Sequence, residues 1–138
     1  TMDEASFIGE VLRRTGCGLL LDVTNVHVSC TNHGRDAAGY LNALPLDAVG
    51  EIHLAGFARD EDAAGATLLI DSHGSPVDEA VWRLYESVIA RTGAAPTLLE
   101  RDNDVPSLAT LVAEAGCAEA LMDRAAEPRR CGLYWGCA

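Results

Sequence analysis

The feature that most constrains the fold is an alternation of short apolar runs with segments of helical periodicity. The apolar runs are 18–23 (GLLLDV), 49–56 (VGEIHLAG), 67–71 (TLLID) and 96–100 (PTLLE). Continuous apolar runs of this length are typical of strands buried on both faces of a parallel sheet. The sequence therefore predicts an α/β protein in which helices cover a parallel sheet of four strands.

Segments with helical spacing lie between and beside these runs. We expect helices over 3–16, 36–44, 77–93 and 104–127, the last interrupted at Gly116. Four strand–helix units make either a small open sheet or half of a (βα)8 barrel. No linker divides residues 1–127, so we expect one domain, followed by an irregular tail over 128–138.

Charge and cysteine content indicate which binding partners and which cellular compartment are compatible with the sequence. The net charge is −11, which argues against nucleic acid or an anionic membrane as a partner. Every basic residue is Arg, so Schiff-base chemistry and a P-loop lysine are excluded. The five cysteines form no C-x-x-C pair, and we expect reduced thiols, a cytoplasmic location and no membrane span.

Each apolar run ends in a residue that could bind a metal. In parallel α/β folds the C-terminal ends of the strands line one face, where ligands gather. We therefore expect these side chains to converge, with oxygen and nitrogen donors that suit Fe(II), Mn(II) or Zn(II). The candidates are Asp22, His53, Asp71, His73 and Glu100, with Asn25, Glu51 and Asp102 close by in sequence.

Simpler interpretations exist for each candidate taken alone. Asp22 could form a turn after its strand, and His53 could be a core histidine with satisfied hydrogen bonds. The Asp71–Gly74 segment could be a turn with a local hydrogen bond, and Glu100 could only pair with a neighbouring arginine. The recurrence at all four strand ends favours a shared site.

Two other segments carry weaker signals. Residues 27–34 (HVSCTNHG) contain His27, Cys30 and His33, but the spacing fits no cysteine protease, and we interpret the segment as a polar loop. Residues 59–65 are interpreted as a solvated loop. Trp82 and Tyr85 lie on the amphipathic segment 77–93 and are predicted to be packing residues.

Four segments together resemble the C-terminal half of the multinuclear non-haem iron-dependent oxidative enzymes. These are GLLLDVTNVHVSCTNHG, LPLDAVGEIHLAG, LLIDSHGSPVDEAVWRLYE and PTLLERDNDVPSLATLVAEA. The resemblance covers roughly residues 3–116 and implies a (βα)8 barrel of the xylose-isomerase-like type. It also implies two or three iron ions, the use of O2 to modify cysteines in ribosomally made peptides, and a partner protein that presents the peptide.

The family motifs fall on the residues already selected. The D-x-N-N strand end falls on Asp22–Asn25, and E-I-H-L-A-G-H falls on Glu51–Phe57, with His53 in the ligand position. D-T-H-G falls on Asp71–Gly74 and E-W-D on Glu100–Asp102. The resemblance thus implies metal ligands at Asp22, His53, Asp71, His73 and Glu100, and supporting roles for Asn25, Glu51 and Asp102.

The chain departs from the family at three motif positions: Thr24 stands for an asparagine, Phe57 for a histidine and Arg101 for an aromatic residue. The family's N-terminal ligands have no counterpart in these residues. We therefore expect a second copy of the chain, in a homo-oligomer, or a missing N-terminal half to complete the site. Association is also expected because the unpaired edges of the first and last strands tend to pair with another chain. The alternatives are a metal-dependent sugar isomerase or hydrolase on the same barrel, and a degenerate, non-catalytic half-barrel that acts as a binding module.

Overall fold

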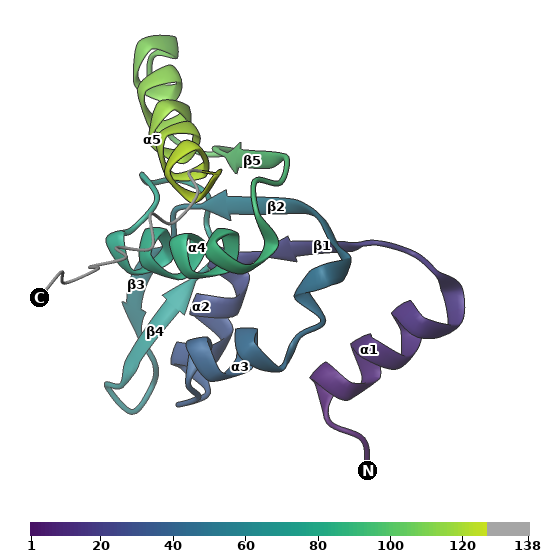
Figure 1. Ribbon diagram of the computed structural model, residues 1–138. Helices are drawn as coiled ribbons and strands as arrows, with labels where there is room; N and C mark the ends of the chain where they lie inside the picture. The colour runs from purple at the N-terminus through teal and green to yellow at the C-terminus, as the bar shows by residue number, and fades with distance from the viewer. Residues whose placement is uncertain (127–138) are drawn as a thin grey trace, which may run out of the picture.

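The computed structural model describes residues 1–126, an α/β arrangement in which helices alternate with the strands of a parallel sheet (Figure 1). The predicted tail over 128–138 lies outside the described residues. The elements in chain order are α1 (Glu4–Thr15), β1 (Leu19–Asp22), α2 (Val23–Asn32), α3 (Ala37–Ala43), the 3-10 turn η1 (Leu46–Ala48), β2 (Val49–Ala55), β3 (Ala58–Glu61), β4 (Thr67–Ile70), α4 (Glu79–Thr92), β5 (Thr97–Glu100) and α5 (Leu108–Ala126).

The parallel sheet has three strands in the order β1-β2-β5, with β2 in the centre. Asp22 at the end of β1 lies beside His53 of β2, and Ala55 at the end of β2 lies beside Glu100 of β5. The C-terminal ends of all three strands therefore meet at one edge, as the sequence predicts.

The prediction that the strand at 67–71 joins this sheet is wrong. β4 instead pairs antiparallel with β3 in a separate hairpin. β3 falls in the segment interpreted as a solvated loop, because all four of its side chains are exposed and leave no apolar signal. The hairpin turn is held by the Asp62 carboxylate, which accepts hydrogen bonds from the backbone N–H groups of Ala64 and Ala66.

The prediction of a polar loop over 27–34 is also wrong, since α2 extends to Asn32. Asp22 caps the helix by accepting a hydrogen bond from the Asn25 N–H. Val23, Val26 and Cys30 are buried on one side. The helix is rich in β-branched residues with modest helix propensity, so tertiary packing rather than local preference stabilises it.

The other predicted helices form close to their expected bounds. Asp3 caps α1 and Asp78 caps α4, while Gly16 and Gly93 end these two helices with positive φ angles of 69° and 76°. The predicted interruption at Gly116 does not occur, and α5 runs continuously through it. A single glycine inside a helix costs only about 0.5–1 kcal/mol, which packing elsewhere can offset.

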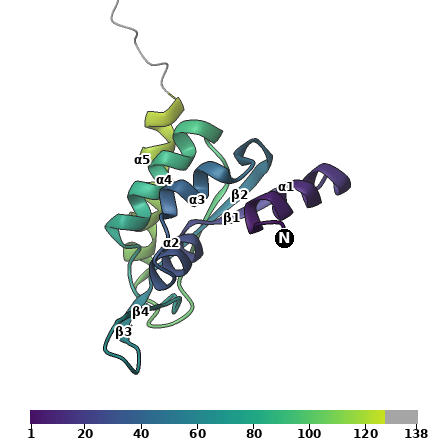
Figure 2. The ribbon, with the colours of Figure 1, turned by 90° about the horizontal axis from the view of Figure 1, so that it is seen from below.

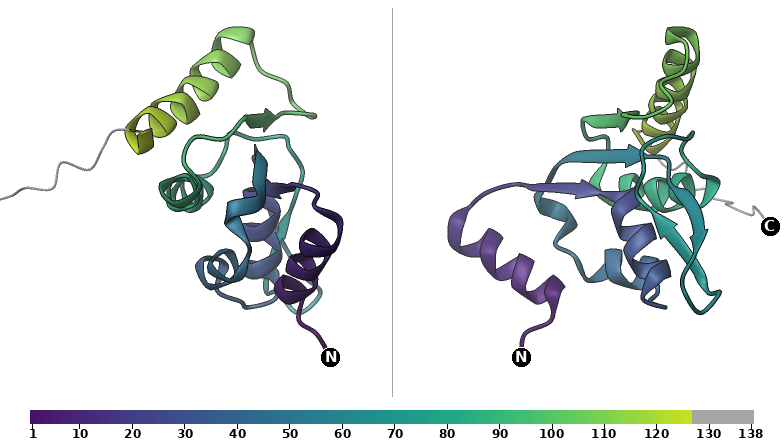
Figure 3. Two further views of the ribbon diagram at one scale, coloured as in Figure 1. Left: turned by 45° about the vertical axis from the view of Figure 1, so that its right-hand side comes forward. Right: turned by 180° about the vertical axis from the view of Figure 1, so that it is seen from behind.

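Helices α2, α3 and α4 lie on the same side of the parallel sheet (Figures 2 and 3). Ile52 and Leu54 of β2 are fully buried against this side, together with Val81 and Tyr85 of α4. Tyr85 and its neighbour Trp82 contribute to packing, as predicted. None of the helices within residues 1–126 is long and apolar enough to cross a membrane.

Within residues 1–126, no helix or strand covers the other side of the parallel sheet. Leu20 of β1 is 51% exposed and Leu98 of β5 is 46% exposed. Because side chains alternate along a strand, the same face carries His53 and Glu100. The candidate metal ligands of the sheet therefore lie on its uncovered face.

Candidate metal centre

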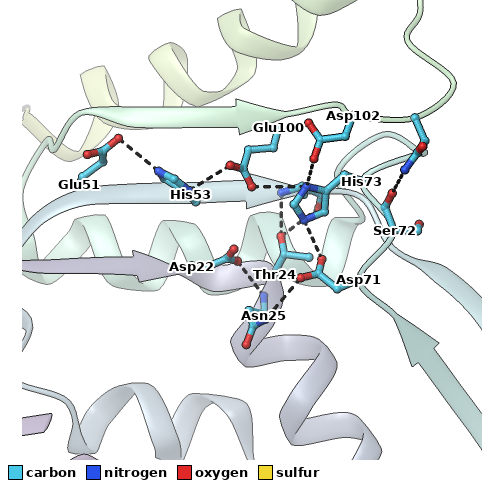
Figure 4. A network of polar contacts seen from close by, with 12 residues as sticks. Asp22, Thr24, Asn25, Glu51, His53, Asp71, Ser72, His73, Glu100 and Asp102 are labelled. Carbon is cyan, nitrogen blue, oxygen red and sulfur yellow. Dashed lines mark hydrogen bonds and ion pairs between the residues drawn. The ribbon is translucent and has the colours of Figure 1, made fainter.

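The ends of the three parallel strands bring together three predicted ligands (Figure 4). Asp22, His53 and Glu100 each offer one donor atom, and these atoms all lie within 4.8 Å of one another. All three residues are partly buried. A carboxylate pair and an imidazole at this spacing form a group that could hold a metal ion.

Asp22 serves local structure and the site at once. One of its carboxylate oxygens, Oδ1, accepts the hydrogen bond from the Asn25 N–H at 2.7 Å. Burial is the main factor that raises the pKa of Asp22, and the negative charges of Asp71 and Glu100 raise it further. The simpler interpretation of Asp22, a local hydrogen bond after its strand, is thus correct for Oδ1. Its other carboxylate oxygen forms no such capping hydrogen bond within the described residues.

Glu100 connects the two histidines. Its Oε1 lies 3.3 Å from His53 Nδ1, and its Oε2 lies 3.5 Å from His73 Nδ1. Glu100 does not pair with a neighbouring arginine: Arg101 bonds to Glu114, and Arg91 donates to the Asn42 side chain. The carboxylate of Glu100 therefore faces the site.

Asp71 and His73 reach the site from the loop that follows the β3–β4 hairpin, not from the end of a strand of the parallel sheet. His73 has a positive φ of 52°, a conformation that side-chain-bearing residues seldom adopt. Two backbone hydrogen bonds hold it there: His73 N–H donates to the Gly56 carbonyl, and Asp102 N–H donates to the His73 carbonyl. Strained residues that are held in this way cluster at functional sites.

Gly56 allows this loop to pass close to the end of β2. A Cβ atom at position 56 would overlap with the carbonyl group of Ser75. The requirement for glycine here comes from the close approach of two backbone segments. Gly56 thus positions His73 in two ways. Its lack of a side chain leaves room for the loop, and its carbonyl group accepts the hydrogen bond from the His73 N–H.

Each histidine has one carboxylate partner that can fix its tautomer. Glu51 Oε1 lies 3.2 Å from His53 Nε2, and Asp102 Oδ2 lies 3.1 Å from His73 Nδ1. The ring proton is then held at the nitrogen next to each carboxylate. The lone pairs of His53 Nδ1 and His73 Nε2 remain available to bind a metal ion. His53 Nδ1 then faces Glu100, and His73 Nε2 faces Asp71.

The contact between His73 and Asp71 tests whether the site fits a cation. Asp71 Oδ1 lies 3.1 Å from His73 Nε2, but this buried oxygen has no hydrogen-bond partner within residues 1–126. Its other oxygen accepts a hydrogen bond from Asn25 Nδ2 at 3.3 Å. Two electron-pair donors that face each other in a buried place need a proton or a cation between them, so the residues fit a metal ion.

The electrostatics at His73 agree with this geometry. Burial lowers the pKa of His73, but the Asp71 charge, the hydrogen bond to Asp102 and the Glu100 charge outweigh it. The net effect raises the pKa of His73 above its ordinary value. The site therefore attracts positive charge, whether carried by a proton or by a metal.

The three departures from the family motifs each have a local explanation. The fully buried Thr24 bonds to Ala55 of β2. Phe57 packs with its ring centroid 5.2 Å from that of His27. Arg101 forms an ion pair of 3.0 Å with Glu114 in which the two side chains are 7% and 13% exposed.

The second candidate group, in residues 27–34, is not arranged for catalysis. Cys30 is buried, and burial raises the pKa of its thiol. A nucleophilic cysteine needs the opposite shift, toward the thiolate. His33 is exposed at the C-terminal end of α2.

Sequence reasoning missed several residues that support the site. Asn103 Nδ2 donates a 2.7 Å hydrogen bond to the Ser72 carbonyl and so holds the Asp71–Gly74 loop. Gly56 was also missed, because its role depends on a segment far away in the sequence. Asn32 was missed for the same reason, since its side chain bonds to the backbone of Leu69 in β4. For Thr24, the sequence did hold a local sign of a supporting role, namely its position between Asp22 and Asn25.

Comparison with known proteins identifies the family of the chain. Residues 1–123 match the family described as "RiPP precursor modification enzyme MbnB/TglH/ChrH". A UPF0276 protein of Bordetella parapertussis is 62% identical over 123 residues, which are 89% of this chain and 43% of that protein. UPF0276 proteins of Caulobacter sp. strain K31 and Rhizobium meliloti are 52% and 54% identical, over 46% and 40% of their lengths.

The chain thus spans less than half the length of these relatives. The family match nevertheless includes all the strands of the parallel sheet and every candidate ligand. On this evidence, the chain belongs to the family of RiPP precursor modification enzymes MbnB/TglH/ChrH.

Proposed function

We propose that this chain is the C-terminal part of an iron-dependent oxidase that uses O2 to modify cysteine residues of ribosomally made peptides. The observation that carries the proposal is the convergence of side chains from β1, β2, β5 and the loop after β4 on one place. The proposed metal ligands are Asp22, His53, Asp71, His73 and Glu100.

The donor set supports iron over softer metals. It consists of carboxylate oxygens and imidazole nitrogens with no thiolate, a combination that suits Fe(II) and also Mn(II) or Zn(II). Iron, when bound, would mediate the transfer of electrons from the substrate cysteine to O2 and favour the thiolate form of that cysteine. The protein would supply the geometry of the donors and their protonation states.

Three residues are proposed to support the ligands without binding the metal. Glu51 and Asp102 would hold the two histidines in the tautomers that leave a nitrogen free toward the site. Asn25 donates from its backbone to Asp22 and from its side chain to Asp71. It would therefore keep these two carboxylates close despite their mutual repulsion.

The open face of the parallel sheet supports a proposed partner. Parallel sheets are ordinarily covered on both faces, yet here Leu20 and Leu98 are about half exposed. We propose that the additional segment carried by the longer relatives covers this face and completes a (βα)8 barrel. A cysteine-containing peptide and its presenting protein would then approach the C-terminal ends of the strands.

Metal analysis of the purified chain tests the proposed site. The chain is purified without oxygen, incubated with Fe(II), Mn(II) or Zn(II), and desalted, and the bound metal is measured by inductively coupled plasma mass spectrometry. We expect bound Fe(II) in a fixed ratio to protein, and its loss in His53→Ala and His73→Ala. His33→Ala is the matched control, because this histidine is exposed and lies outside the site.

Oxidation of a peptide tests the proposed reaction. The iron-loaded chain is mixed with the N-terminal segment of a relative, a cysteine-containing peptide encoded near that relative, and O2. Mass spectrometry should show a mass change at cysteine that is absent in a Cys→Ser peptide. A chain that holds no stoichiometric iron would support a non-catalytic binding module, and activation by Mn(II) of a sugar reaction would support an isomerase.

A further inference from the structure

Helix α2 is fastened at both ends to strands that lie far away in the sequence. Near its start, the Thr24 hydroxyl accepts a hydrogen bond from the Ala55 N–H at 2.8 Å and donates one to the Ala55 carbonyl at 2.9 Å. At its end, Asn32 Oδ1 accepts from the Leu69 N–H at 2.8 Å, and Nδ2 donates to the Leu69 carbonyl at 2.9 Å. Each side chain satisfies both backbone groups of one strand residue, as a neighbouring strand would.

The Thr24 contact fixes the ligands carried by the parallel sheet. Ala55 is the last residue of β2 and lies beside Glu100 of β5. Thr24 itself stands between Asp22 and Asn25 at the end of β1. The two hydrogen bonds therefore fix the end of β1 against the ends of β2 and β5, and the full burial of Thr24 excludes water as a substitute.

The Asn32 contact fixes the ligands carried by the loop. Leu69 lies in β4, two residues before Asp71, and its side chain is buried. The β3–β4 hairpin is not part of the parallel sheet, so its position depends on contacts such as this one. α2 packs against both β2 and β4, and it connects the two groups of ligands.

We propose that α2 is the positioning element of the metal site and that Thr24 and Asn32 are its positioning residues. Thr24 holds Asp22 in register with His53 and Glu100. Asn32 holds the hairpin so that Asp71 and His73 meet the ligands of the sheet. This inference rests on the proposed metal site, and it concerns residues that do not touch the metal.

A merely structural role makes a different prediction. If these hydrogen bonds only stabilised the fold, their loss would lower the melting temperature and leave metal binding by the folded protein unchanged. If they position the ligands, their loss weakens metal binding and alters the coordination geometry while the protein remains folded. The absorption spectrum of bound Co²⁺ reports that geometry directly.

The test titrates Co²⁺ into the metal-free full chain without oxygen and records visible absorption and binding heat. Thr24→Val keeps the shape of the side chain and removes both hydrogen bonds, whereas Thr24→Ser keeps the hydroxyl. Asn32→Ala removes the second contact, and Asn42→Ala, an asparagine on α3, is its matched control. Circular dichroism confirms that each variant is folded at the temperature used.

We expect Thr24→Val and Asn32→Ala to weaken Co²⁺ binding about 10- to 100-fold and to change the spectrum, as losses of supporting contacts do in other metal sites. Thr24→Ser and Asn42→Ala should bind as the wild-type chain does. Folded Thr24→Val and Asn32→Ala with wild-type affinity and spectrum would overturn the inference. Should Thr24→Val fail to fold, the exposed Asn32 position decides the question by itself.

The wild-type chain separates this inference from the proposed function. A wild-type chain that binds no Co²⁺, Fe(II) or Mn(II) overturns the metal site, and the positioning role fails with it. A wild-type chain that binds metal, with variants that bind equally well, overturns the positioning role and leaves the metal site in place.

Discussion

Nε2 of His73 lies 3.1 Å from Oδ1 of Asp71, and this buried oxygen has no hydrogen-bond partner in the part of the chain that the structure describes. The pair occupies the D-x-H segment that follows the apolar run at 67–71. Sequence reasoning explains the pair as the end of a buried parallel strand, whereas the structure places it in a loop with His73 at positive φ. The two side chains still meet, and together they form a place for positive charge.

The first prediction concerns the pH dependence of metal binding. The raised pKa of His73 means that a proton competes with the metal for Nε2. We expect the affinity for Mn²⁺ to fall as the pH decreases through this pKa, which lies above the ordinary histidine value of 6.5. Calorimetry at several pH values, in buffers of different ionisation heat, would also detect the released proton.

The metal-free protein should show the opposite trend in stability. A histidine with a raised pKa in the folded state stabilises the fold fully below about pH 6.5, and this contribution is lost as the pH rises through the folded-state pKa. The contribution of His73, measured as the wild-type minus His73→Gln melting temperature without metal, should shrink as the pH rises above the ordinary histidine value of 6.5. A difference that does not change with pH would show that the carboxylates around His73 do not act on it.

The second prediction separates ligands from supporting residues. Glu100→Gln keeps the shape of the side chain but removes the charge next to both histidines. We expect it to weaken Mn²⁺ binding by more than the 10- to 100-fold loss that is typical of supporting groups. Asp102→Asn should fall within that range, since the Asp102 side chain is 73% exposed and its carboxylate contacts Nδ1 of His73, not Nε2. Equal losses in the two variants would contradict the assigned roles.

The third prediction concerns Gly56. An alanine side chain here would overlap with the Ser75 backbone, so the loop that carries His73 must move. We expect Gly56→Ala to lower the free energy of unfolding by about 1–3 kcal/mol or more and to abolish metal binding. Gly116→Ala is the control, because a Cβ there meets nothing within 4 Å and should stabilise α5 by about 0.5–1 kcal/mol.

The fourth prediction concerns the ion pair between Arg101 and Glu114, which joins the segment after β5 to α5. Glu114 also accepts a hydrogen bond from the Val77 N–H, so it connects α5 to the start of the α4 segment. Because both side chains are nearly buried, Arg101→Met leaves an unpaired charge and should cost about 3–5 kcal/mol in urea unfolding.

Two further variants check the cause of this loss. Arg101→Met combined with Glu114→Gln removes the unpaired charge while keeping an acceptor for Val77, and we expect it to recover much of the stability. Arg83→Ala breaks an exposed pair with Glu79 and should cost only about 0–1 kcal/mol. A double variant as unstable as Arg101→Met would show that packing, rather than charge, accounts for the loss.

Much of the fold could be predicted because its signals are local. The caps Asp3 and Asp78, and the terminal glycines Gly16 and Gly93, mark α1 and α4 directly in the sequence. The parallel strands are recognisable because they form short apolar runs such as LLLD and TLLE, which are typical of parallel-sheet strands. The candidate site residues could be selected for the same reason, since each follows an apolar run.

The errors occur where the signal is not local. α2 is rich in β-branched and polar residues, and it becomes a helix because Val23, Val26 and Cys30 find a core to pack against. β3 has four exposed side chains and becomes a strand only through its backbone pairing with β4. No periodicity within either segment predicts these outcomes.

The sequence by itself determined the class of fold, the helix ends and the chemical identity of the donors at the ends of the strands, because caps, apolar runs and residue types act over a few neighbouring positions. The tertiary structure alone decided which strands pair, that Asp71 and His73 approach from a hairpin loop, and that α2 joins the two groups of ligands. The reason is physical: the pairing of the parallel strands and the contacts of Thr24, Asn32 and Gly56 connect residues more than 15 positions apart, and their free energy is gained only when the chain has folded.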